Sequence, residues 1–68
     1  MRTIDEVKAD LPAVAVKVNG RLVVGTIKGR MNDFATITFE LGGCDISFEA
    51  SWECVTRAVN NKGFVRYN

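Results

Sequence analysis

Residues 34–50 read Phe-Ala-Thr-Ile-Thr-Phe-Glu-Leu-Gly-Gly-Cys-Asp-Ile-Ser-Phe-Glu-Ala, and this stretch decides the fold of the chain. Two alternating segments flank Gly42-Gly43, a dipeptide that favours a two-residue hairpin turn. That turn pairs apolar residues with apolar ones: Leu41 with Cys44, Phe39 with Ile46, Ile37 with Phe48, and Ala35 with Ala50. The pairs between them are polar: Glu40 with Asp45, Thr38 with Ser47, and Thr36 with Glu49. A slip of one residue would mix the two faces, so the sequence predicts a hairpin with a fixed register.

A second hairpin is predicted upstream, where residues 13–18 and 21–30 flank Asn19-Gly20, a typical type I′ turn. Both of its faces are partly apolar. One face carries Val14, Val16, Val18, Val23 and Ile27. If that face is the core, then Ala15, Leu22 and Val24 on the other face are exposed among basic residues, which is the composition of an interface. The alternative is that a bent second strand uses these residues inside a barrel core.

Glycines punctuate the second strand of this upstream hairpin. Gly25 and Gly29 interrupt an otherwise β-branched and basic segment. We expect them to mark a kink or a close backbone approach in a strongly bent strand.

Helices are predicted on either side of the two hairpins. Thr3 and Glu6 form a capping box for a short helix over residues 4–10, which Pro12 ends and whose apolar positions Ile4, Val7 and Leu11 share one face. Ser51 can cap a helix from Trp52 to about Val59. Trp52 shares an apolar stripe with Val55 and Val59, so we expect it to plug one end of the core. Residues 64–67 follow as a last short strand.

The order of these elements, with the stretch Phe48-Glu49-Ala50-Ser51-Trp52-Glu53, resembles the Src-homology-3-like small barrels. The resemblance covers residues 13–68 at the level of architecture and includes no diagnostic motif. It implies a mainly β fold: one domain over residues 1–68, a five-stranded barrel with a short N-terminal helix and a helix or helical turn between strands 4 and 5. An oligonucleotide-binding-type barrel is the structural alternative. The aromatic signature of proline-rich peptide binding is absent, so that activity is not implied.

Charge is segregated along the 68 residues, although the net charge is only +1. Residues 11–31 carry four bases and no acid, residues 32–54 carry five acids and no base, and residues 55–68 are basic again. In a small barrel the fifth strand lies beside the first, so the two basic blocks meet on one side and the acids lie on the other. This arrangement predicts a dipolar surface, which concerns partners rather than catalysis.

The basic side is therefore the predicted partner-binding surface. Its cations and apolar residues, together with one aromatic residue, are Lys17, Arg21, Leu22, Val24, Lys28, Arg30, Arg66 and Tyr67. The first hypothesis is a non-enzymatic adaptor that contacts a protein partner or assembles with its own copies through opposite poles. The second hypothesis is weak, salt-sensitive binding of nucleic acid, in which Tyr67 or Phe64 stacks on a base. A pI of about 7.8 argues against the second.

Catalysis and cofactor binding have little support in the sequence. The chain has no histidine, Gly25-x-x-x-Gly29 lacks the lysine of a phosphate loop, and no small-molecule substrate or cofactor is indicated. An enzyme whose site is shared between subunits, as in the plasmid-encoded type II dihydrofolate reductases, is a further alternative, although their Val-Gln-Ile-Tyr signature is missing. Cys44 and Cys54 lack further ligands for zinc and are expected to be reduced and buried.

The sequence also indicates the cellular compartment of the protein. No apolar run approaches the ~20 residues of a membrane span. The polar start Met1-Arg2-Thr3-Ile4-Asp5-Glu6 lacks the apolar region of a signal peptide, so we expect a cytoplasmic protein without membrane contact.

Overall fold

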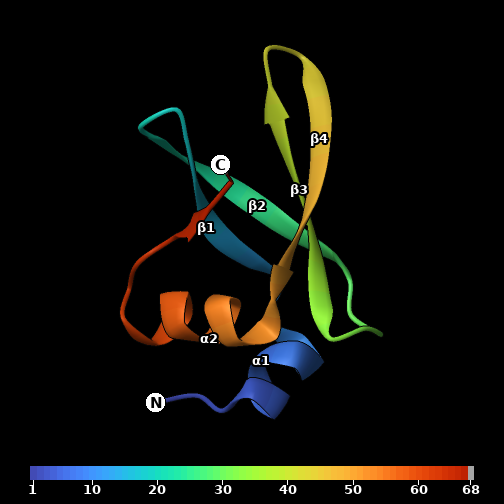
Figure 1. Cartoon of the computed structure of the whole chain (residues 1–68), viewed down its shortest axis with the longest axis vertical. Helices are drawn as coiled ribbons and strands as arrows, with labels where there is room; N and C mark the ends of the chain where they lie inside the picture. Colours follow the sequence, from blue (N-terminus) through green and yellow to red (C-terminus); the bar gives the residue numbers. More distant parts are fainter. Residues whose placement is uncertain (68) are drawn as a thin grey trace.

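The computed structural model describes residues 1–67 and shows a mainly β fold with two short helices, as predicted (Figure 1). In chain order the elements are α1 Ile4–Asp10, β1 Ala13–Val18, β2 Arg21–Gly29, β3 Phe34–Leu41, β4 Cys44–Ser51, α2 Trp52–Asn60 and β5 Val65–Arg66. The strands form one sheet in the order β4-β3-β2-β1-β5. The β5 strand lies beside β1, as expected, and runs parallel to it, so the sheet is mixed.

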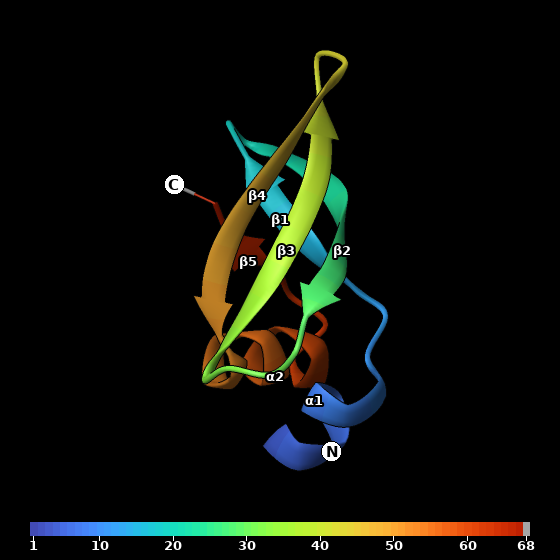
Figure 2. The same cartoon turned by 90° about the vertical axis from the view of Figure 1, so that its right-hand side faces the viewer.

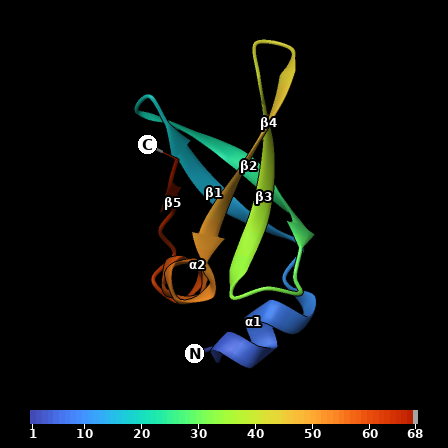
Figure 3. The same cartoon turned by 45° about the vertical axis from the view of Figure 1, so that its right-hand side comes forward.

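The sheet is strongly curled into a half-barrel, and both helices lie at one end of it (Figures 1 and 3). The two hairpins rise from that end and diverge, and the β3–β4 hairpin projects beyond the β1–β2 hairpin (Figure 2). Pairing between β2 and β3 explains the divergence, because it covers only Thr26 to Gly29 against Thr36 to Thr38 and contains a bulge between Ile27 and Gly29.

Both hairpin turns have the backbone geometry that their sequences predict. Asn19 and Gly20 have φ values of 50° and 80°, and Gly42 and Gly43 have φ values of 60° and 83°. These positive φ values are those of type I′ turns. The register of β3 with β4 matches every predicted pair, from Leu41 with Cys44 to Ala35 with Ala50.

The core lies on the concave side of the sheet and is covered by the helices. The side chains that are best buried come from four different elements and are Ile37, Val7, Val16 and Val55. Trp52 is 4% exposed, and its Nε1 donates a hydrogen bond to the carbonyl oxygen of Asn32 at 2.9 Å. Trp52 therefore packs into the helical end of the core, as predicted, and ties α2 to the connection between β2 and β3.

Gly25 lies on the core face of β2 where two neighbouring side chains approach closely. A Cβ atom at this position would lie 2.5 Å from Cγ2 of Ile37 and 2.6 Å from Cγ2 of Val16. The predicted close approach is confirmed, because only a residue without a side chain leaves room for these two methyl groups.

The N-terminal helix is fixed by its cap and by an arginine from β2's end. Thr3 and Glu6 form the predicted capping box, and the backbone N–H and hydroxyl of Thr3 lower the pKa of the Glu6 carboxyl from its ordinary value. Arg30 donates hydrogen bonds from its guanidinium to the carbonyl oxygens of Lys8, at 3.0 Å, and Leu11. Carbonyl oxygens at the C-terminal end of a helix lack hydrogen-bond partners within the helix, so Arg30 supplies donors for them.

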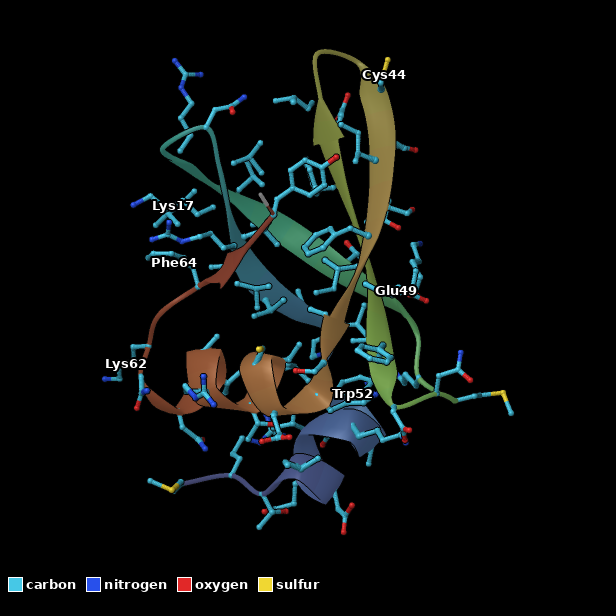
Figure 4. The ribbon with its side chains drawn as sticks, viewed as in Figure 1. Lys17, Cys44, Glu49, Trp52, Lys62 and Phe64 are labelled. Atoms are coloured by element: carbon cyan, nitrogen blue, oxygen red, sulfur yellow. The ribbon has the colours of Figure 1, made fainter. Side chains whose placement is uncertain are left out.

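Two predictions about burial are wrong. Cys44 and Cys54 are unbridged but exposed. Cys44 lies at the tip of the projecting hairpin (Figure 4), and Cys54 lies at an exposed position in the first turn of α2. Ile4 is 41% exposed, because the first turn of α1 extends past the core that buries Val7 and Leu11.

Candidate partner-binding surface

The outer face of β1, β2 and β5 carries the apolar cluster expected from the sequence. Leu22 is 62% exposed and Val24 is 73% exposed, while Ala15, which pairs with Val24, is half-buried. The core residues of the same hairpin, Val14, Val16 and Val18, point to the concave side. The alternative, in which Leu22 and Val24 lie inside the barrel, is therefore wrong.

Cations surround this apolar cluster. Lys17 pairs with Leu22 on one side and with Arg66 on the other, so strand register places a lysine and an arginine next to each other. Both lie at the edge of a hollow of about 230 Å³ that also includes the turn residues Asn19 and Gly20. The Nζ of Lys17 lies over the ring of Phe64, 4.8 Å from the ring centroid, which is a cation–π contact.

One further cation of this surface lies on β2. Lys28 lies within the bulge and is exposed. We define the basic–apolar face by the residues that share this outer surface: Lys17, Leu22, Val24, Lys28 and Arg66.

The structure separates three predicted residues from this face. Arg21 pairs with the core residue Val18, so its side chain leaves β2 on the concave side and not beside Leu22. The guanidinium of Arg30 is used inside the molecule, where it holds the end of α1. Tyr67 lies on the concave side, because it follows the outward-facing Arg66 by one position in an extended segment. Its ring packs edge-on against Phe39 and Phe48, at centroid distances of 5.1 and 5.2 Å.

Acidic residues occupy the outer face of the other half of the sheet. Glu40 pairs with Asp45, and Glu49 pairs with Thr36. Figure 4 shows Lys17 and Glu49 on opposite sides of the molecule. In the part of the chain that the structure describes, the ion pair found joins Arg2 to Asp10, so neither group of sheet charges is neutralised by the other.

Sequence reasoning missed two contributors to the surface and its support. Phe64 was considered only as a stacking residue, yet it contacts Lys17 on the outer face. The cluster of Phe39, Phe48 and Tyr67 joins β3, β4 and the C-terminal segment. The sequence could have indicated both contributors. Residues 64–67 are expected to form a strand, and alternation along a strand places Phe64 and Arg66 on one face and Tyr67 on the other.

The surface of the molecule is the main basis for inferring its function. No protein-family model, curated protein or solved structure matches this chain. Among residues 1–67, neither helix has the length and apolar character needed to cross a bilayer.

Proposed function

We propose that this protein is a non-enzymatic binding module that acts through protein–protein contacts at the basic–apolar face. The observation that supports this function best is the exposure of Leu22 and Val24, two positions apart on the outer face of β2. Exposing two large aliphatic residues among cations is unfavourable for an isolated surface, whereas it matches the apolar centre and charged rim of an interface. The Src-homology-3-like resemblance supports the proposal only as an architecture that serves as a binding module.

The charge pattern favours a partner with an acidic surface. Lys17 and Arg66 lie next to each other and have no carboxylate partner among residues 1–67. The acidic half of a second copy, with Glu40, Asp45 and Glu49, offers such a surface. Contact between two different faces of identical chains is heterologous, so it builds a ring or a filament rather than a two-fold dimer.

Light scattering coupled to size-exclusion chromatography at low and high salt tests the self-assembly form of this proposal. We expect a larger species at low salt that dissociates as salt is added, because exposed charge pairs are screened. The double variant Lys17→Glu and Arg66→Glu should abolish it. Arg57→Glu with Lys62→Glu is the matched control, because it removes the same charge from exposed positions outside the basic–apolar face. Equal loss in both variants, or a monomer at every salt concentration, would contradict self-assembly.

Binding of single-stranded nucleic acid is the second candidate, and one observation favours it. The hollow between the β1–β2 turn and β5 places Lys17 and Arg66 together, with the Phe64 ring beside Lys17. Phosphate contacts from two cations with a nearby aromatic ring are the elements of sequence-independent binding. A fluorescent oligothymidine probe should then bind in low salt, and the Lys17→Glu and Arg66→Glu variant should lose this binding while the control variant retains it.

A further inference from the structure

The β4 strand buries its concave side chains less well than the strand that it pairs with. Ala35, Ile37 and Phe39 of β3 are 0%, 0% and 3% exposed. Their register partners on β4, which are Ala50, Phe48 and Ile46, are all only partly buried. The difference arises because β4 is the edge of the sheet, so no further strand among residues 1–67 covers the outer flank of these side chains, although the ring of Tyr67 contacts Phe48.

A groove separates this edge from β5 on the other side of the half-barrel. It has a volume of about 640 Å³ and lies between β4, α2 and β5. Its apolar lining comes from all three elements and includes Ala50, Ala58 and Val65. Glu49 of β4, labelled in Figure 4, and Arg66 of β5 are also among the residues that line the groove.

The backbone of β4 offers hydrogen-bonding groups along this groove. In a hairpin with a two-residue turn, the residues that close the turn bond to each other, and every second pair after them does so too. Leu41 and Cys44 close the turn, so the polar backbone groups of Ser47 and Glu49 point away from β3 and toward the groove. An extended chain laid along β4 would find these donors and acceptors available.

The charges on β4 restrict what can bind there. Two β4 strands paired antiparallel about Ser47 would place Asp45 of each copy opposite Glu49 of the other, and like charges directly opposite each other are unfavourable. This register of a symmetric dimer is therefore disfavoured. A strand with basic side chains on the outer face and apolar side chains on the concave face would instead match Asp45 and Glu49 on one side and Ile46, Phe48 and Ala50 on the other.

We propose that the β4 edge accepts an extended segment of a partner protein, in which basic and apolar residues alternate, as an additional antiparallel strand. The groove along this edge shares only Arg66 with the basic–apolar face, and the proposal goes beyond the proposed function. The added strand would cover the open flank of β4 and extend the curled sheet toward β5. Recognition would combine backbone hydrogen bonds to Ser47 and Glu49 with charge pairing on the outer face.

A capped hexapeptide, acetyl-Lys-Val-Lys-Val-Lys-Val-amide, is the probe for a titration followed by amide chemical shifts of the protein. We expect shifts along Cys44–Ser51 of β4 and saturable binding. The peptide acetyl-Glu-Val-Glu-Val-Glu-Val-amide should bind at least tenfold more weakly, because its carboxylates face Asp45 and Glu49. Binding that is absent, or that shifts only the outer residues of β1 and β2, would overturn the proposal.

Methylated peptides separate strand addition from simple charge attraction. In an antiparallel strand beside β4, the lysine opposite Asp45 or Glu49 directs its backbone N–H toward β4. Methylation of the lysine backbone nitrogens should therefore abolish binding, whereas methylation of the valine nitrogens should preserve it with the same charge and composition. Equal binding by both methylated peptides would overturn the proposal.

Variants of the protein provide the reciprocal test. Asp45→Lys with Glu49→Lys should weaken binding of the lysine peptide roughly tenfold. Asp33→Lys with Glu53→Lys changes the same charge at exposed positions away from the β4 edge and is the matched control. Equal weakening in both variants would show nonspecific attraction and overturn the proposal. The methylated peptides test the unmodified protein, so their outcome does not depend on how these variants fold.

Discussion

The two hairpins of this protein share a turn type but differ in how they divide apolar residues between their faces. In the β3–β4 hairpin, the outward-facing pairs from Glu40 with Asp45 to Thr36 with Glu49 are polar, and the apolar exception is Phe34 at the base of β3, which is 50% exposed. In the β1–β2 hairpin, the outward face includes Leu22 and Val24, which are 62% and 73% exposed. The first pattern is what folding alone requires. The second departs from it at the face that we propose to bind a partner.

The largest expected effect concerns the residue that joins the two hairpins to α2. Trp52→Ala removes a 4% exposed ring and its hydrogen bond to the Asn32 carbonyl, and should lower the free energy of unfolding by about 3–5 kcal/mol. That loss is a large part of the about 3–10 kcal/mol expected for a chain of this length. Urea denaturation measures it. Trp52→Phe, which keeps most of the ring, should lose much less, and equal loss in both variants would assign the effect to the hydrogen bond.

A smaller effect tests whether the β1–β2 hairpin is as tightly packed inside as its neighbour. Gly25→Ala places a Cβ atom 2.5 Å from Cγ2 of Ile37, and we expect it to destabilise by about 1–3 kcal/mol because a packed core resists extra volume. Thermal unfolding of this variant should be compared with that of Gly29→Ala, where the nearest atom is the Thr36 hydroxyl oxygen at 3.0 Å. An unchanged melting temperature for Gly25→Ala would show that the two hairpins differ inside as well as outside.

The outward face of the β3–β4 hairpin can be made to resemble that of β1–β2. Thr38→Val removes the hydrogen bond between the Thr38 and Ser47 hydroxyls, which is 2.8 Å long and exposed. We expect a loss of about 0.5–1 kcal/mol or less in urea denaturation, because water replaces an exposed partner. A loss above about 2 kcal/mol would mean that the polar face of this hairpin is structural rather than merely solvated.

The smallest effect on stability should accompany the largest effect on binding. Leu22→Thr with Val24→Thr gives the β1–β2 hairpin the polarity of its neighbour and should change stability by about 0.5 kcal/mol or less at each site, since both residues are exposed. The same variant should lose the assembly that we expect in light scattering at low salt. Strong destabilisation would show that Leu22 and Val24 serve the fold, and it would remove the main support for an interface.

The β3–β4 hairpin was the element that the sequence predicted best, because a single register places its apolar pairs on one face and its polar pairs on the other. Every β3–β4 pair follows from the position of Gly42-Gly43 and the alternation around it. The role of Arg30 could not be predicted, because it depends on the end of α1 folding back to lie beside the end of β2. The parallel direction of β5 and the groove beside β4 also depend on the path of the chain through α2, which local patterns do not specify.

Parallel pairing of β5 with β1 has a consequence for how the molecule acquires its surface during folding. Each hairpin joins neighbouring segments and can form within microseconds, whereas Val16 and Val65 are 65 − 16 = 49 positions apart. We therefore expect the β1–β5 pair to form late. Lys17 and Arg66 are brought together only in that step, so a partner that requires both cations discriminates the completed fold from its partly folded precursors.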